Sequence, residues 1–389
     1  MQTLAEQTAK TILGSSLFFS TSKGHDNPSK VLLTIAYQLA TKLPSYRTFL
    51  CDKLTVDPLL SEKSITKQFS ELIFDPFVRR CIYQGPDSLL VLIDGLDECR
   101  GEREQLELTG LISYFAAVHP RVPLIWTIAT RPEPYIIAFL SRSSILPHYV
   151  KEELLLDSTE ACQDVEHYLL DELERIKESY LATRFLSNWP TETQILKITA
   201  AGSGLFAFAA TVIRFVDDIL VGNPKAQLDR IIEAIENTVS PTHPLHGGPH
   251  PMAHLDALYT YILSQIPKGT LPITRALLRH YLPYGAGPSE SFALTCNWLS
   301  LTPDVVFGAM HRLHSVFDLP TSPSRVDMMQ HRMGFLHQSF CDYLSDPIRS
   351  GVYALPRDEC VEQDLDCAIR VLNECGPGIY SPILRVRKE

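Results

Sequence analysis

Two short apolar runs, each followed at once by polar residues, constrain the fold more than any other feature of this 389-residue sequence. The first covers residues 88–93 (SLLVLI) and the second covers residues 123–129 (PLIWTIA). Nearly every position in each run is apolar, which is typical of a strand covered on both faces. Residues 105–118 between them have the period of the crossover helix that parallel strands require. The pattern predicts a parallel α/β sheet in which residues 88–93 form a central strand.

The rest of the first half continues this alternation of strands and helices. SLFFS at 16–20 is a strand candidate, and residues 28–43 place apolar side chains at helical spacing, with Pro28 suited to a first turn. We expect a second helix at 65–83, a weaker strand near 153–156 and a helix at 162–176. Short strands alternating with helices predict an α/β fold for this half.

The second half has helical periodicity and few strand signals. Residues 240–254 (SPTHPLHGGPHPMAH) are too rich in proline and glycine for a helix or a strand, and mark a boundary. Beyond them we expect short helices at 255–265, 271–281 and 303–316, then a turn at 319–324, a short alternating segment and a helix at 338–344. Helices followed by a hairpin indicate a winged helix.

These patterns divide the chain into five expected parts. They are an α/β domain at 1–158, a helical subdomain at 159–239, a linker at 240–253, a winged-helix-like domain at 254–355 and a C-terminal helical segment at 356–389.

Charge and composition exclude several classes of protein. Thirty-five basic and 45 acidic residues give a net charge of −10, which predicts no nucleic-acid partner and no attraction to an anionic membrane. The apolar runs fall short of the ~20 residues that a membrane span needs, and no basic-then-apolar signal region begins the chain. The nine cysteines include no C-x-x-C pair. Reduced thiols in a cytoplasmic protein are the expected outcome.

The carboxylates after the first apolar run are the first candidate site. Asp94 ends this run, and Asp97 and Glu98 follow it. Ligands of open α/β sheets bind at the carboxyl ends of the strands, and Mg²⁺ takes oxygen ligands from carboxylates and phosphates. The alternative is that Asp94 and Gly95 only form a turn after a core strand.

The second apolar run ends in Thr130 and Arg131. An arginine there could clamp a terminal phosphate, or it could simply cap a surface loop. Because parallel strands joined by right-handed crossovers end on the same side, we expect Asp94, Asp97 and Arg131 to converge on one edge of the sheet.

Taken together, these motifs resemble a known family. LLVLIDGLDEC and LIWTIATRPEP resemble the Walker B and sensor elements of NACHT-type P-loop NTPases. These signal-transduction ATPases are abundant in filamentous fungi, and the resemblance is to their nephrocystin-3-like N-terminal type. LGSSLFFS is similar to the family's second strand, AGSGLFAFAATVIRFVDD to its helical segment, and HSVFDLP with GFLHQSFCDYLSDPIRS to its winged-helix end.

The resemblance implies a fold, ligands and roles. The fold is a P-loop NTPase-like parallel sheet followed by a helical subdomain and a winged helix, and the cofactors are ATP or ADP with Mg²⁺. Asp94 would be the Mg²⁺-side aspartate, acting through water, and Asp97 and Glu98 the catalytic acids. Arg131 would be the sensor. His337 would contact the β-phosphate and face the sheet edge across a cleft, and the alternative is a histidine that simply lines the core of its own domain. The implied function is an ATP/ADP switch in immune-like or self/non-self signalling, with homo- or hetero-oligomerisation among full-length NACHT proteins.

The sequence departs from this family at the phosphate-binding loop. The motif G-x-x-x-x-G-K-[ST] does not occur in the 389 residues. We therefore expect a sheet that lacks its first strand and phosphate loop, a chain that begins inside the helix after that loop, and weak or absent ATP binding without hydrolysis. Two alternatives stay open. The first is a non-catalytic interaction or regulatory fragment, or a truncated gene model, of a full-length NACHT protein, and the second is a metal-dependent hydrolase.

Three smaller features of the sequence also carry expectations. His243, His246, His250 and His254 could bind a metal, although the prolines between them favour a linker. We expect Ser203 to be a helix N-cap. The pair Asp217 and Asp218 is expected on a solvated helix face.

Overall fold

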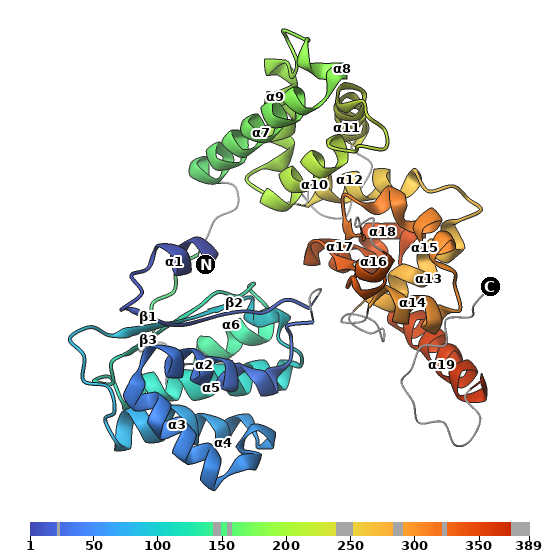
Figure 1. Cartoon of the computed structure of the whole chain (residues 1–389). Coiled ribbons are helices and arrows are strands. Elements are labelled where there is room, and N and C mark those ends of the chain that lie inside the picture. The colour runs from blue at the N-terminus through green and yellow to red at the C-terminus, as the bar shows by residue number, and fades with distance from the viewer. Residues whose placement is uncertain are drawn as a thin grey trace. The chain divides into compact units, whose positions relative to one another are not determined.

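The computed structural model describes residues 1–21, 24–142, 149–153, 158–238, 252–282, 291–320 and 325–374. The chain divides into two compact units, residues 1–153 and residues 154–389, and each is described by itself (Figure 1).

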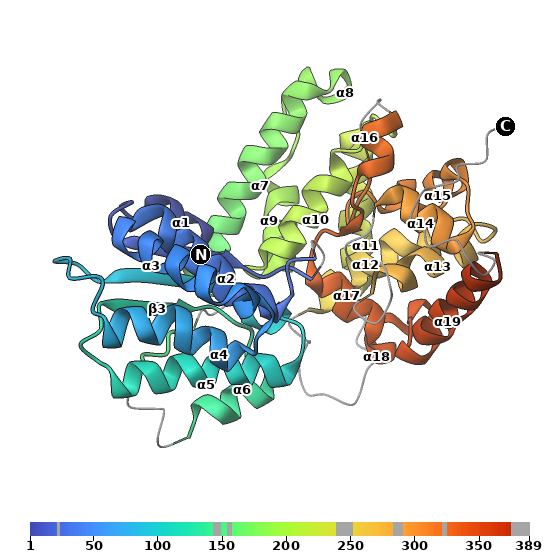
Figure 2. The same cartoon turned by 60° about the horizontal axis from the view of Figure 1, so that its bottom comes forward.

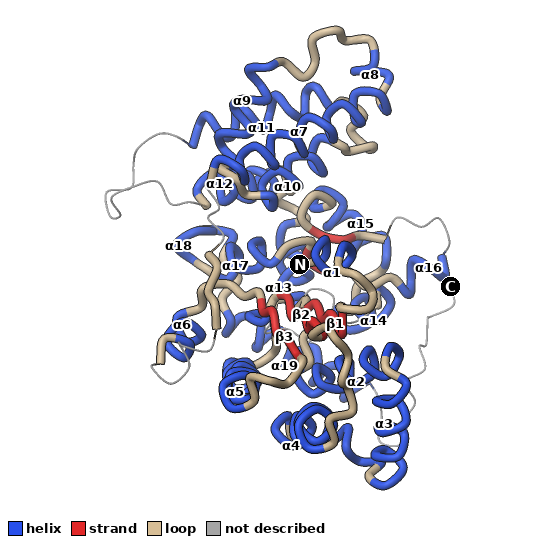
Figure 3. Tube along the Cα trace, turned by 90° about the vertical axis from the view of Figure 1, so that its left-hand side faces the viewer, coloured by secondary structure: helices blue, strands red, loops and turns tan. Residues whose placement is uncertain are grey.

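A three-stranded parallel sheet forms the centre of the first unit. The strands are β1 (Leu13–Phe18), β2 (Leu89–Asp94) and β3 (Leu124–Ile128), in the spatial order β1-β2-β3 (Figure 3). Leu17, Ile93 and Ile128 are neighbours in register across the sheet. The expected central strand is therefore confirmed, whereas the first strand begins three residues earlier than predicted.

Helices cover one face of this sheet. They are α2 (Val31–Lys42), α4 (Ile65–Phe69) and α5 (Glu102–Val118), which lie on the same side of the strands in two views (Figures 1 and 3). Leu89, Val91 and Ile93 alternate along β2 and enter the core beneath these helices. The other elements of the unit are α1 (Gln2–Gln7), α3 (Pro44–Val56), a π-helical stretch at Ser70–Arg79 and α6 (Pro134–Leu140).

A glutamine from α2 pairs with the outer edge of β1. The Ser16 N–H donates to Gln38 Oε1 at 2.8 Å, and Gln38 Nε2 donates to the Ser16 carbonyl oxygen at 2.8 Å. Lys42 of the same helix donates to the carbonyl oxygen of Leu13. Unpaired edges invite further strands. These side chains take the place of a neighbouring strand on this edge.

The second unit is almost entirely helical. Its first part contains α7 (Thr159–Ser179), α8 (Leu181–Arg184), α9 (Glu192–Gly202), α10 (Phe206–Val216) and α11 (Pro224–Thr238). Helices α7, α9 and α10 pack against one another (Figure 2). One continuous apolar core runs from these helices into the later part of the unit.

The later part adds eight helices and a short strand pair among the described residues. The helices are α12 (Ala253–Ser264), α13 (Leu271–Tyr281), α14 (Phe292–Leu299), α15 (Pro303–Met310), α16 (Arg325–Gln330), α17 (Gln338–Ser345), α18 (Pro347–Ser350) and α19 (Arg357–Glu374). Strands β4 (Phe317–Asp318) and β5 (Gly334–Phe335) pair antiparallel where a hairpin was expected. The predicted fold class, a parallel sheet followed by a mostly helical remainder, is confirmed.

Two local expectations are wrong. Ser203 is the C-cap of α9, with a left-handed φ of 45°, because Gly202 ends that helix before α10 begins. Asp217 and Asp218 do not lie on a solvated helix face, since Asp217 caps the end of α10 and pairs with Arg175 at 2.8 Å. Asp218 accepts a hydrogen bond from the Leu220 N–H at 2.8 Å in the loop that follows.

Some expectations fall on residues outside the described ranges. They include most of the strand near 153–156 and of the linker at 240–253. The division into five domains stays a prediction. Among the described residues, no helix is both long and apolar enough to cross a membrane.

Candidate functional site

The residues after β2 and β3 lie at the carboxyl end of the sheet because both strands run in the same direction. Asp94 is the last residue of β2 and is followed by Gly95. The φ of Gly95 is 68°, in the left-handed region that glycine adopts more easily than other residues. A Cβ at Gly95 would also meet the Phe19 carbonyl oxygen at 3.3 Å. This turn leads directly into a 3₁₀ helix, Leu96–Glu98, which holds the two further carboxylates.

Asp97 joins the ends of the two strands. Its Oδ1 accepts a hydrogen bond from the Arg131 N–H at 3.0 Å, and its Oδ2 lies 3.5 Å from Arg131 Nε. Thr130 Oγ1 lies 3.4 Å from the same carboxylate. The Asp97 side chain is only 9% exposed, against 38% for Arg131. The structure thus brings Asp97 and Arg131 together, although it does not test the roles predicted for them.

Glu98 connects this edge to the loop after β1. Its Oε2 accepts a hydrogen bond from the Thr21 N–H at 2.9 Å, and its carbonyl oxygen accepts one from Thr21 Oγ1 at 3.2 Å. In this arrangement the Glu98 carboxylate orders a neighbouring loop.

A second link joins the same two loops. Arg100 donates to both carboxylate oxygens of Asp26, from Nε at 3.0 Å and from an Nη at 3.2 Å. The Arg100 N–H also donates to the Asp26 carbonyl oxygen at 2.8 Å. Bidentate pairs of this kind fix geometry as well as charge. The segment 94–100 is therefore held by Thr130 and Arg131, which follow β3, on one side and by the loop after β1 on the other.

Asp94 is half-buried, and burial raises the pKa of its carboxyl group above the ordinary value. The neighbouring Asp97 carboxylate adds to this rise, whereas the amino group of Met1 and a hydrogen bond from Gly95 oppose it. A cation beside Asp94 would favour the charged form and reverse the shift. A bound cation would therefore stabilise the charged form of the Asp94 carboxylate against the cost of its burial.

The donor set bears on whether Mg²⁺ fits here. Mg²⁺ is usually held by one or two carboxylates together with waters and phosphate oxygens. Asp97 is paired with Arg131, so Asp94 is the carboxylate suited to this role. Within the described ranges, no group of three or more His, Cys, Asp or Glu side chains could hold a metal ion. Such an ion would therefore need oxygens from a ligand.

His337 belongs to the second unit and caps a helix there. Its Nδ1 accepts a hydrogen bond from the Ser339 N–H at 3.1 Å at the start of α17, and lies 2.6 Å from Ser339 Oγ. Its predicted contact with a nucleotide stays a prediction. His243, His246 and His250 lie outside the described residues, and His254 stands on α12.

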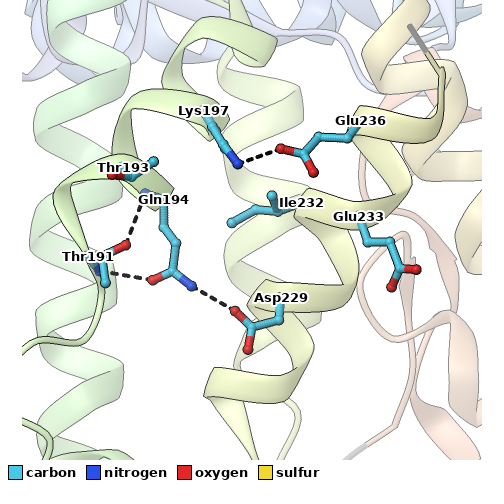
Figure 4. A pocket seen from close by; sticks show the side chains of 8 residues that line it. All are labelled: Thr191, Thr193, Gln194, Lys197, Asp229, Ile232, Glu233 and Glu236. Carbon is cyan, nitrogen blue, oxygen red and sulfur yellow. Dashed lines mark hydrogen bonds and ion pairs between the residues drawn. The ribbon is translucent and has the colours of Figure 1, made fainter. Parts of the chain in front are cut away.

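Two surface grooves lie away from these residues. One, of about 260 Å³, lies between α9 and α11, and several of its polar side chains pair with one another (Figure 4). Lys197 pairs with Glu236, and Gln194 donates to Asp229 at 2.7 Å. The other, of about 670 Å³, includes Pro123, which precedes β3, and so lies at the opposite end of the strands from Asp97. Neither groove contains Asp94, Asp97, Glu98 or Arg131, so the sheet edge remains the candidate site.

The links made by Thr21, Asp26, Arg100 and Gln105 were missed by sequence reasoning. Gln105 Nε2 donates to the Asp97 carbonyl oxygen at 3.0 Å and receives support from Tyr135, whose hydroxyl donates to Gln105 Oε1 at 2.6 Å. The signal that could have pointed to Asp26 is the polar loop GHDNP at 24–28, which follows a strand that neighbours β2.

Comparison with known proteins gives one match. Residues 1–127 match the family described as "Nephrocystin 3, N-terminal". The matched residues include Asp94, Asp97 and Glu98 but end before Arg131 and His337. The match is consistent with a NACHT-type P-loop NTPase relation, and this relation suggests nucleotide binding. No curated protein and no solved structure matched the chain.

Proposed function

We propose that this chain is a NACHT-type nucleotide-dependent signalling or scaffold module of the cytoplasm, an ATP/ADP switch in immune-like or self/non-self signalling. The observation that carries the proposal is the pair formed by Asp97 and Arg131 at the carboxyl end of a parallel sheet. This edge is where open α/β sheets bind ligands. The family match over residues 1–127 supports the same assignment.

The proposed roles follow the chemistry of each group. Asp94 would hold Mg²⁺ through water, and that ion would neutralise phosphate charge. Asp97 and Glu98 are the proposed catalytic acids of the family's site, and Arg131 its phosphate sensor. A terminal phosphate near Arg131 would compete with Asp97 for the guanidinium group, which gives the edge a way to respond to the nucleotide. His337 is the proposed contact from the winged-helix-like region.

The same chemistry argues against hydrolysis by this chain alone. Phosphoryl transfer rests on positioning and on stabilising charge on the β- and γ-phosphates. A ring of backbone N–H groups and a lysine usually position the phosphates and stabilise their charge. The sequence contains no G-x-x-x-x-G-K-[ST] motif to supply these groups. Three carboxylates would repel a triphosphate unless Mg²⁺ were bound.

A second candidate function is a non-catalytic interaction or regulatory module that pairs with full-length NACHT proteins. The hydrogen bond that Glu98 accepts from the Thr21 N–H favours it, because this carboxylate already has a structural role. Oligomerisation with such proteins is the activity that this candidate proposes.

An equilibrium titration with a fluorescent ATP analogue separates the two candidates. For the first, we expect Mg²⁺-dependent binding weaker than about 100 μM, a free energy of roughly −5.5 kcal/mol. Asp94→Ala should abolish it. Asp52→Ala, at an exposed position on α3, should leave it unchanged. Micromolar binding that survives Asp94→Ala would place the phosphate site elsewhere, and no binding at any Mg²⁺ concentration would favour the non-catalytic candidate.

A further inference from the structure

Helix α19 contacts the rest of the second unit through its polar side chains. Gln363 Nε2 donates to the Ala276 carbonyl oxygen of α13 at 2.8 Å, and Trp298 Nε1 of α14 donates to Asp364 Oδ1 at 3.1 Å. Arg370 donates to the Asn297 carbonyl oxygen at 3.0 Å. Of the described side chains of α19, Cys360 alone is buried. Hydrogen bonds, rather than an apolar stripe, hold this helix in place.

The apolar stripe of α19 faces away from the unit. Its members are exposed by 42% to 73% and are spaced four, four and three residues apart: Val361, Leu365, Ile369 and Leu372. This spacing places them in one row along the helix. An amphipathic helix normally packs on its apolar row, so α19 has the reverse orientation. Figure 2 shows α19 at the outer end of its unit. A contiguous exposed apolar row of this kind is a candidate contact surface.

An acidic row lies beside the apolar row. Asp358, Glu362 and Asp366 are exposed and each stands three positions before a member of the apolar row. Side chains three residues apart are neighbours on a helix, so the two rows run in parallel. The surface therefore suits a segment that combines apolar side chains with positive charge.

The chain itself contains a segment of this composition. After the turn-forming sequence Gly-Pro-Gly at 376–378, residues 379–388 read IYSPILRVRK, with five large apolar residues and the three cations Arg385, Arg387 and Lys388. These residues lie outside the described part of the chain. Ten residues can span about 33 Å when extended. The apolar row of α19 is about 16 Å long. The segment is long enough to reach along the whole row.

We propose that the exposed face of α19 is a docking surface and that its occupant is the segment 379–388 of the same chain. The apolar side chains of the segment cover the row from Val361 to Leu372, and its cations lie beside Asp358, Glu362 and Asp366. A second copy of α19 fits this face less well, because it would set one acidic row beside another.

Carbodiimide cross-linking of the full chain, read by mass spectrometry, tests this proposal. The reagent joins a lysine amine to an adjacent carboxylate with loss of one water. Lys388 is expected to link to Asp358, Glu362 or Asp366. A mixture of ¹⁴N- and ¹⁵N-labelled chains should show these links within single chains. Links of Lys388 spread over unrelated carboxylates, or found only between chains, would overturn the proposal.

Matched variants test the apolar part of the contact. Leu365→Ser combined with Ile369→Ser should reduce the yield of these links at least about five-fold, since one to two kcal/mol changes a population by that factor or more. Leu384→Ser changes the segment and leaves α19 intact, and it should act in the same direction. Leu196→Ser, at a similarly exposed position on α9, should have no effect. An unchanged yield in both Leu365→Ser/Ile369→Ser and Leu384→Ser would overturn the proposal, because attraction of charges alone would then account for the links.

Discussion

The Asp97 side chain links the segment after β2 to the residues that follow β3. Its carboxylate accepts the Arg131 N–H, pairs with the Arg131 guanidinium group and lies near the Thr130 hydroxyl. Because the side chain is 9% exposed, water cannot easily replace these contacts. The same residue is thus a structural link and a proposed catalytic acid.

Asp97→Ala is expected to lower the free energy of unfolding of the protein by about 1–3 kcal/mol, because it removes the acceptor of a partly buried N–H and of a guanidinium group. Urea unfolding followed by fluorescence measures the change. Asp52→Ala is the control, since Asp52 is exposed on α3. Equal stabilities of Asp97→Ala and Asp52→Ala would show that the link contributes nothing to folding.

At this scale, part of the candidate site could be predicted from the sequence. The proximity of Asp97 and Arg131 follows from two parallel strands and the residues that end them. The pairing of Asp26 with Arg100 could not be predicted, because the two residues are 74 positions apart and meet only through the path of an irregular loop. The capping role of His337 was also missed, since histidine is not among the common N-cap residues.

At the scale of elements, the edge of β1 depends on one side chain of α2. Gln38 satisfies both the N–H and the carbonyl oxygen of Ser16. The amide offers a donor and an acceptor on one planar group, as a backbone peptide group does. This contact fixes how α2 lies against the sheet.

Gln38→Leu should therefore lower the free energy of unfolding by about 1–3 kcal/mol, the cost of leaving partly buried backbone groups without partners. Gln38→Glu keeps the acceptor for the Ser16 N–H but sets a carboxylate against the Ser16 carbonyl oxygen, and should also destabilise. Thermal unfolding monitored by circular dichroism measures both. Tyr37→Leu, at the exposed neighbouring position, is the control. A Gln38→Leu variant as stable as Tyr37→Leu would show that the edge does not need the amide.

Glu71 connects α3 to the π-helical stretch and gives a pH-dependent prediction. Hydrogen bonds from Lys53 and then Lys67 lower the pKa of its carboxyl group to about 2. Because the pKa is lowered, the charged Glu71 carboxylate stabilises the folded protein above the ordinary pKa. This stabilisation is lost as the pH falls toward the pKa of the folded state. The affected window therefore runs from about pH 4.5 down to about pH 2.

We expect Glu71→Gln to cost about 1 kcal/mol at pH 7, because solvent screens partly exposed ion pairs. The difference from the native chain should shrink through that window and vanish near its lower end. Urea midpoints at pH 7, 4 and 3 measure it, with Glu62→Gln as an exposed control. A difference that stays constant from pH 7 to pH 3 would contradict the assignment.

Elements with strong periodicity could be predicted, and weakly patterned ones could not. Helix α13 begins and ends where its spacing indicates, and β2 and β3 are within one residue of expectation. Helix α3 was missed because it buries only Tyr46 and Phe49, too few positions to produce a recognisable period. The expected helix at 65–83 becomes a π-helix from Ser70, a change of winding that periodicity does not report.

At the scale of the whole molecule, the order of sheet and helices could be predicted because parallel strands and long helical regions leave separate patterns. The orientation of α19 could not, since its spacing alone predicts that the apolar row packs inward. We propose that this chain has nucleotide-binding chemistry at its sheet edge but cannot hydrolyse ATP alone.

Release of phosphate from Mg·ATP by the full chain tests this claim most directly. The assay should use protein whose cooperative unfolding has been verified, so that inactivity does not reflect a loss of folding. We expect the native chain and Glu98→Gln both to release phosphate at the rate of buffer alone. Turnover well above that rate, abolished by Glu98→Gln, would show that this chain does hydrolyse ATP alone, and would mean that other residues of this sequence replace the phosphate-binding loop.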